Sequence, residues 1–187
     1  MVHGTKADAE ALRDEIAGVL STMGLRLSQE KTLITHIEQG LDFLGWRIQR
    51  HRKPGTTNRY YVYTYPAKKA LRAITAKVKT LCRQVGTNQP LDALLTRLNP
   101  AVRGWCAYFR PGVSSATFSY LSYYLWHTVW GWVQRKHPKT GRRKIFRHYS
   151  GRGSWWASEN RKLFNPNTVG TTRYRGLAIP TPWEATG

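Results

Sequence analysis

Apolar residues near the start of the chain recur at the spacing of one helical face. They predict a helix that begins after an N-cap at Thr5, carries the acidic Asp8 in its first turn and ends at Gly24. The residues that form this face are Leu12, Ile16, Val19, Leu20 and Met23.

The pattern then changes to the alternation of apolar and polar residues that is typical of strands. Residues 32–37 alternate weakly, Gln39-Gly40 predicts a turn, and residues 41–48 are predicted to be the second strand of a hairpin. A basic, turn-rich loop over residues 50–59 follows, and the tyrosine-rich residues 60–65 predict a third strand.

Beyond residue 66 the apolar period lengthens to that of a helix, about 3.6 residues. Residues 67–85 predict a helix whose apolar stripe is formed by Leu71, Ile74, Val78, Leu81 and Val85. A second stripe, roughly a third of a turn away, holds four cations and no acid: Lys68, Arg72, Lys79 and Arg83. Because intrahelical salt bridges cannot explain cations without acids, this stripe is a candidate binding surface.

Three more helices are predicted downstream. Pro90 begins a short helix through Leu98, and Asn99 as N-cap with Pro100 in the first turn begins the next. The longest helix, over residues 115–136, is apolar all round and is expected to lie inside a bundle. One of its faces is marked by Phe118, Leu121, Leu125, Val129 and Trp132. The predicted fold class is therefore α+β and predominantly α: a helix and a hairpin, then a helical bundle and an irregular C-terminal tail.

Charge is distributed unevenly along the chain. The net charge is +20, but residues 1–45 carry four Lys and Arg against seven acids, whereas residues 46–187 carry 26 against three. Self-repulsion on that scale disfavours a compact state unless a polyanion neutralises it. Eight Trp and ten Tyr favour a nucleic acid as that polyanion, because bases stack on aromatic faces.

The two cysteines and the absence of long apolar runs bear on the compartment. Cys82 and Cys106 lie in apolar helical contexts, so we expect buried free thiols in a reducing environment. No run of about 18 apolar residues could span a bilayer, and no signal-peptide pattern opens the chain. The expected location is the bacterial cytoplasm, or an organelle or the nucleus in a eukaryote, with no membrane partner.

Residues 98–110 contain the most specific motif. The pattern Asn-Pro-x-x-Arg-Gly-Trp-x-x-Tyr-Phe resembles the signature of the maturase (X/thumb) domain of group II intron-encoded reverse transcriptases. Arg103 and Arg110, seven positions apart, share a helical face and are expected to reach phosphate together; Gly104 is expected to allow either a close helix approach or a bend. Three aromatic residues are expected in the core rather than on bases: Trp105, Tyr108 and Phe109.

Two earlier segments are similar to the same family. Residues 24–32 resemble the element that follows the catalytic strand in the palm of these polymerases, and residues 41–46 resemble their primer-grip hairpin. The resemblance covers residues 2–150. It implies a palm remnant over residues 1–65 and a thumb/maturase domain over residues 66–150. Residues 151–187 are outside the resemblance, and their many Gly, Pro, Asn and Thr predict an irregular extension wrapped on the body.

The polymerase chemistry of the family depends on a Tyr-x-Asp-Asp turn whose carboxylates hold two magnesium ions. The family places this turn just upstream of the segment that matches Val2-His3-Gly4, so it is not expected here, and no other Asp-Asp pair occurs. We therefore expect no catalytic residue and no enzymatic activity from the chain alone. Two alternatives stay open. The chain is the C-terminal half of a split reverse transcriptase, completed by a separate chain that bears the carboxylates, or it is an inert, degenerate remnant of such a protein.

Metal and cofactor sites are not expected either. His137 and His148 flank a basic stretch, but no Cys-x-x-Cys pair completes a zinc site. His127, inside the longest predicted helix, is expected to be a packed or hydrogen-bonded core residue rather than a ligand.

Residues 132–149 are the strongest candidate for RNA binding. They hold seven Lys and Arg and two His, and they predict a helix end, a basic turn and an extended segment. The helix dipole explains part of the charge at Arg135 and Lys136 but none of the charge that follows. The resemblance implies that this region grips structured intron RNA and stabilises its active fold for splicing. The residues predicted to bind RNA are Lys68, Arg72, Lys79, Arg83, Arg103, Arg110, Arg135, Lys136, Lys139, Arg142, Arg143, Lys144 and Arg147.

Overall fold

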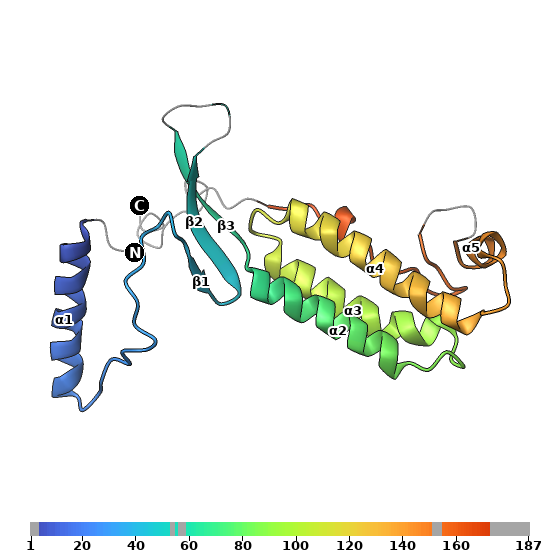
Figure 1. The fold of residues 1–187 in the computed structure, drawn as a ribbon, viewed down its shortest axis with the longest axis horizontal. Coiled ribbons are helices and arrows are strands. Elements are labelled where there is room, and N and C mark those ends of the chain that lie inside the picture. The colour runs from blue at the N-terminus through green and yellow to red at the C-terminus, as the bar shows by residue number, and fades with distance from the viewer. Residues whose placement is uncertain (1–3, 53–54, 56–58, 151–154, 173–187) are drawn as a thin grey trace, which may run out of the picture. The chain divides into compact units, whose positions relative to one another are not determined.

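The computed structural model describes residues 4–52, 55, 59–150 and 155–172. In these ranges the chain forms five α-helices, one three-stranded antiparallel sheet and a short 3-10 helix, which confirms the α+β, predominantly helical fold class (Figure 1). The described residues divide into two compact units. The first comprises those of Met1–Leu41 and Gln49–Tyr61, and the second those of Asp42–Ile48 and Val62–Gly187.

The first helix, α1 (Lys6–Thr22), forms as predicted, and side-chain hydrogen bonds cap its N-terminus. Thr5 and Asp8 make a capping box: the Thr5 amide donates to Asp8 Oδ2 at 2.6 Å and the Asp8 amide donates to Thr5 Oγ1 at 3.3 Å. These bonds lower the pKa of Asp8. No residue of α1 is buried, and its apolar face is exposed at Leu12, Ile16, Val19 and Met23.

The sheet has the order β1 (Leu41–Phe43), β2 (Trp46–Arg52), β3 (Tyr60–Pro66). The third strand is confirmed, but two predictions about its neighbours are wrong. Residues 32–37 form no strand, and the segment predicted as one strand over residues 41–48 is itself a hairpin. Its turn is Leu44-Gly45, where both φ angles are positive, 49° and 83°. A two-residue turn of this handedness matches the twist of paired strands and reverses the chain there.

The predicted basic loop over residues 50–59 is shorter than expected. Residues 50–52 continue β2, where the Arg50 guanidinium lies over the Tyr60 ring of β3 at 4.4 Å from its centroid. Pairing with a tyrosine-rich strand thus extends β2 into a segment whose polar composition predicted a loop. Residues 53–54 and 56–58 lie outside the described residues.

Three helices form the core of the second unit: α2 (Lys68–Gln84), α3 (Leu91–Phe109) and α4 (Ser115–Lys136). They lie side by side in Figure 1, and α2 packs against both of the others. The bounds predicted for α2 and α4 are confirmed to within a residue. The fully buried side chains at their interface include Val78, Leu94, Leu98, Val102, Leu121, Leu125, Val129 and Trp132.

The predicted break at Asn99-Pro100 does not occur, because α3 runs unbroken through both residues. Pro100 removes one helical hydrogen bond, but the buried residues on either side, Leu98 and Val102, hold the helix in the core. Asn99 is not an N-cap: its Nδ2 donates to the Lys162 carbonyl and its Oδ1 accepts from the Phe164 amide, both at 2.9 Å. The capping signal is thus used for a tertiary contact.

The segment predicted to be extended after the basic turn is a helix, α5 (Arg142–Ser150). Ile145 and Tyr149, four residues apart, are buried on one face, and this burial favours a helix over an extended strand. The Tyr149 hydroxyl lies 2.7 Å from His137 Nε2, which links α5 to the end of α4. The expectation of an extended segment is therefore wrong.

Residues 155–172 lie along the bundle. Trp156 is 1% exposed and its indole N–H donates to the Trp126 carbonyl at 3.1 Å. The 3-10 helix η1 (Pro166–Thr168) contacts α3 and α4, and Ser122 of α4 donates to Asn165 Oδ1 at 2.9 Å. Residues 151–154 and 173–187 of the predicted extension lie outside the described residues.

Both cysteines are buried and unpaired, as predicted. Burial raises the pKa of Cys82 to about 11 and that of Cys106 to about 12. The two thiols are therefore neutral side chains of the core at physiological pH.

Among the described residues, no helix combines the length and the apolar character that crossing a bilayer requires.

Candidate nucleic-acid interface

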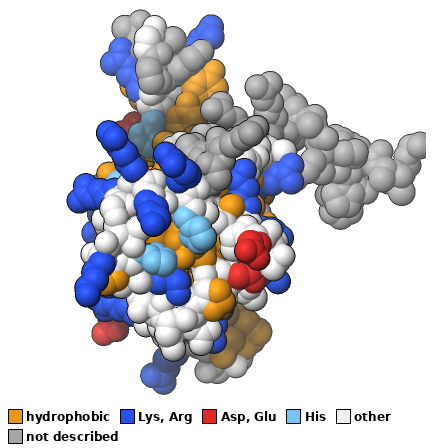
Figure 2. Space-filling view, turned by 90° about the vertical axis from the view of Figure 1, so that its right-hand side faces the viewer, with side chains coloured by type: hydrophobic (Ala, Val, Ile, Leu, Met, Phe, Trp, Pro, Cys, Tyr) orange, Lys and Arg blue, Asp and Glu red, His pale blue; other side chains and the backbone are white. Residues whose placement is uncertain are grey.

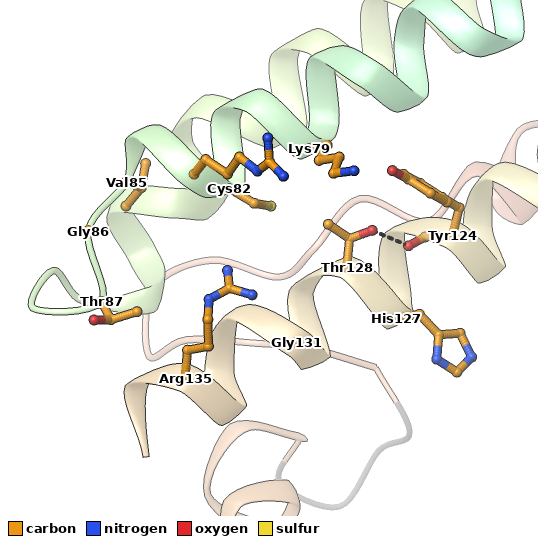
Figure 3. A pocket seen from close by; sticks show the side chains of 11 residues that line it. Lys79, Cys82, Val85, Gly86, Thr87, Tyr124, His127, Thr128, Gly131 and Arg135 are labelled. Atoms are coloured by element: carbon orange, nitrogen blue, oxygen red, sulfur yellow. Dashed lines mark hydrogen bonds between the residues drawn. The ribbon is translucent and has the colours of Figure 1, made fainter. Parts of the chain in front are cut away.

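A groove of about 600 Å³ runs between α2 and α4 (Figure 3). Three cationic side chains line it: Lys79 and Arg83, one turn apart on α2, and Arg135 on α4. Aromatic and polar side chains of α4 complete the wall. The full lining is Lys79, Cys82, Arg83, Val85, Gly86, Thr87, Tyr124, His127, Thr128, Gly131 and Arg135.

The cations of the groove face no carboxylate, since none of the lining residues is acidic. Among the described residues there are five ion pairs, and none includes Lys79, Arg83 or Arg135. All three side chains are exposed. Cations held close together without a counter-charge repel one another, and an anion that binds between them relieves this repulsion.

Hydrogen bonds within the bundle fix the polar wall of the groove. The Tyr124 hydroxyl donates to the Thr75 carbonyl of α2 at 3.3 Å, and Thr128 Oγ1 donates to the Tyr124 carbonyl at 2.7 Å. Cys82 stays neutral, because burial raises its pKa more than the nearby positive charge of Arg135 lowers it. The wall therefore contributes dipoles and no negative charge.

Gly131 opens the middle of the groove. A Cβ at this position would meet only the Arg135 Nη1 atom, at 3.8 Å, so packing does not require glycine. Glycine inside a helix destabilises it by about 1 kcal/mol relative to alanine. Gly131 therefore weakens helix α4 locally and leaves free space in the groove between His127 and Arg135, which lie one turn away on either side.

A second group of cations lies on α5 and on the turn before it. Arg142, Arg143, Lys144 and Arg147 are exposed, while Ile145 and Tyr149 on the opposite face are buried. The first three lie in the first turn of α5, where the helix dipole disfavours positive charge, so helix stability does not explain them. Figure 2 views this end of the bundle and shows many more Lys and Arg side chains than acidic ones.

The remaining predicted site residues are divided between free surface and structural contacts. Lys68 and Arg72 of α2 and Lys139 after α4 are exposed. Three others contact residues of the same chain. The Arg103 guanidinium lies over the Phe164 ring, 5.4 Å from its centroid, and Arg110 Nε donates to the Gly170 carbonyl at 3.1 Å. Lys136 Nζ donates to the Thr87 and Gln89 carbonyls, both at 2.8 Å. Seven of the predicted residues thus lie in the groove or on α5, and the three engaged positions contact loops of the same chain.

The aromatic residues of the signature differ in their surroundings. Phe109 is buried and the Trp105 ring packs on it at 4.5 Å between centroids, as predicted for core residues. Tyr108 is 49% exposed; its ring lies 5.8 Å from Trp46 and its hydroxyl donates to the Leu44 carbonyl at 2.8 Å, so its assignment to the core is wrong. Gly104 permits no close helix approach, because a Cβ there would meet no atom within 4 Å.

The prediction for His127 is also wrong. Its side chain is exposed and lines the groove, because the buried face of α4 passes through Leu125 and Val129 instead. Tyr124 and Thr128 of the same wall were not predicted as site residues. The sequence does carry a signal for this wall: His127, Gly131 and Arg135 recur every four positions and share a helical face.

Comparison with known proteins places the bundle in context. A family described as "Group II intron, maturase-specific domain" matches residues 71–150. The chain is 45% identical to "Protein YkfC" of Escherichia coli (strain K12) over 71 residues, which are 37% of this chain and 18% of that protein. It is 24% identical to "Group II intron-encoded protein LtrA" of Lactococcus lactis subsp. cremoris over 176 residues, which are 82% of this chain and 29% of that protein.

The chain thus spans less than a third of the length of these curated relatives. The matched range 71–150 includes α3, α4, α5 and nearly all of α2, and therefore both cationic clusters. Within the residues that the structure describes, no group of three or more His, Cys, Asp or Glu side chains is placed to hold a metal ion.

Proposed function

We propose that this chain binds structured group II intron RNA without catalysing a reaction, because residues 71–150 match the family described as "Group II intron, maturase-specific domain". Binding stabilises the active fold of the RNA for splicing. The cations of the groove and of α5 contact phosphates and supply the affinity. The shape of the bundle supplies the selectivity for folded RNA.

One observation carries this proposal: the matched range holds fourteen Lys and Arg and a single acid, Asp92. That acid is already engaged, because Ser158 Oγ donates to Asp92 Oδ1 at 2.9 Å and Arg161 Nε lies 3.4 Å from Asp92 Oδ2. Charge of one sign on a folded bundle, without internal neutralisation, is the electrostatic footprint of a nucleic-acid-binding protein.

The experiment is a titration of the full chain with a group II intron RNA and with an RNA duplex of equal length and arbitrary sequence. With about six to ten phosphate contacts, affinity for either RNA falls about 10³- to 10⁵-fold between 50 and 200 mM salt. At each salt concentration the intron RNA binds more tightly than the duplex. Equal affinity for both RNAs throughout the series would reduce the chain to a nonspecific polycation and reject the proposal.

A further inference from the structure

A row of aromatic rings leads along α4 to the cationic groove. Tyr120 and Tyr123 are 51% and 65% exposed, so the core does not use these rings. The Tyr123 ring lies 4.2 Å from that of His127, and the Tyr120 ring stacks on that of Tyr124 at 6.5 Å. His127 and Tyr124 in turn line the groove. Tyr124 faces the space between α2 and α4, whereas His127 lies at the edge of the groove with its ring projecting away from Lys79 and Arg135 (Figure 3). The exposed rings therefore border the cationic groove along the α4 side.

From this juxtaposition we infer that the groove holds an unpaired RNA strand, with its phosphates on Lys79, Arg83 and Arg135 and its bases stacked on Tyr120, Tyr123 and His127. The inference rests on the proposed function and adds which state of RNA this surface takes. Single-strand binding sites in general combine a positive groove that follows the backbone with aromatic side chains on which bases stack.

A double helix does not fit this surface equally well. In a duplex the faces of the bases are covered by their neighbours, and exposed rings gain nothing from it except at its ends. An unpaired base offers a free face, and stacking on tyrosine or histidine tolerates any base.

The test compares a fluorescent 12-nucleotide single-stranded RNA with the duplex of the same sequence, titrated against the full chain. The variants Tyr123→Ala and His127→Ala remove stacking rings from exposed positions, and Tyr123→Phe retains the ring. Phe43→Ala removes an equally exposed ring, 59% exposed, that does not line the groove. Thermal unfolding of each variant verifies that the bundle remains folded.

We expect each alanine variant to bind the single strand about 5- to 150-fold more weakly, which corresponds to about 1–3 kcal/mol per stacked base. Binding of the duplex stays nearly constant, and Tyr123→Phe and Phe43→Ala behave like the unaltered chain. Replacing Lys79 and Arg83 together by alanine weakens the binding of the single strand and of the duplex, because both RNAs carry phosphates. A photocrosslink from 5-iodouridine in the single strand is expected at Tyr123 or His127.

Three results would overturn the inference while leaving RNA binding intact. The first is an equal loss of affinity for the strand and the duplex in the alanine variants, and the second is no loss of affinity for either RNA. The third is displacement of the strand by polyglutamate of equal charge as readily as by unlabelled RNA. The last would identify the groove as a surface for acidic protein segments. If the unaltered chain bound neither RNA, the proposed function would fail together with the inference.

Discussion

Two helices of equal length, α1 and α2, are stabilised in opposite ways. Each has 17 residues and carries apolar residues at helical spacing. The helix α1 has a side-chain capping box and no buried residue, whereas α2 has no side-chain cap and buries Ile74, Val78 and Cys82. Helical spacing therefore predicts that a helix forms, but it does not predict that the apolar face is buried. Burial depends on which other elements pack against that face.

Charge separates the same two regions. The seven acids among residues 1–45 outnumber the four cations there, while the matched range 71–150 has one acid. The proposed function predicts that RNA binding depends on residues 71–150 and not on residues 1–45. Four experiments test this contrast between the two regions, beginning with the largest expected effect.

Replacing the five cations on and before α5 by glutamine should weaken RNA binding by roughly 10³-fold and make the salt dependence shallower, because several phosphate contacts disappear together. The substituted residues are Lys139, Arg142, Arg143, Lys144 and Arg147. All but Lys139 lie on the exposed face of α5, so the melting temperature should change little. The measurement is RNA titration and thermal unfolding on the same preparation.

The matched control neutralises the four cations of the acidic region, Lys6, Arg13, Arg26 and Lys31. We expect RNA affinity to stay close to that of the unaltered chain. A comparable loss in this control would mean that total charge, and not its position on the bundle, determines binding.

Trp132→Ala should destabilise the bundle by about 3–5 kcal/mol, because it empties a fully buried site and removes the indole N–H that donates to the Val85 carbonyl at 2.9 Å. Ile16→Ala on the exposed face of α1 should change the free energy of unfolding by less than about 0.5 kcal/mol. Chemical denaturation measures both. Equal effects would show that the face of α1 is covered in solution.

Thr5→Ala should weaken α1 by about 1 kcal/mol, because it removes the side-chain acceptor of the capping box. The pKa of Asp8 is lowered from its ordinary value of 3.8 by its bonds to Thr5. The contribution of the ionised carboxylate is therefore complete above 3.8 and is lost as the pH falls through the lower pKa of the folded state. Amide exchange of α1 as a function of pH follows this loss. A pH-independent exchange rate in this window, after correction for intrinsic exchange, would contradict the cap.

The smallest effects come from two helix-internal glycines with free space around them, Gly18 in α1 and Gly104 in α3. Alanine at either position should favour its helix by about 0.5–1 kcal/mol. Gly104→Ala should raise the melting temperature of the bundle, whereas Gly18→Ala should only slow amide exchange within α1. A higher bundle melting temperature in Gly18→Ala would show that the two regions unfold as one.

Helices α2 and α4 were predictable because their buried faces repeat over many residues, whereas α3 was predicted with a break and α5 as an extended segment. Phe118, Leu125 and Trp132 specify the inward face of α4 without knowledge of the fold. The errors lie where one residue type has two uses. Asn99 has the properties of an N-cap, yet its amide bonds to a segment more than sixty residues away. Leu44-Gly45 reverses the chain within a pattern that suits one continuous strand.

The candidate site was predictable in kind but not in arrangement. Clusters of cations without acids indicated RNA, and the structure brings Lys79, Arg83 and Arg135 together from two helices. The sequence could not show this pairing, because it depends on how α2 packs against α4. It could not show that Arg110 and Lys136 are engaged with carbonyl groups either, since their partners lie in distant loops.

The bonds of Asn99 and the burial of Trp156 determine where the chain can be cut. The matched range ends at residue 150, but Trp156 fills a site lined by Trp126 and Trp130, with ring centroids 5.3 and 5.5 Å away. A fragment that stopped at residue 150 would leave those rings facing solvent and the amide of Asn99 without the Lys162 and Phe164 backbone. Such an apolar opening favours aggregation. The stretch shared with the family and the smallest stretch able to fold cleanly therefore end at different residues.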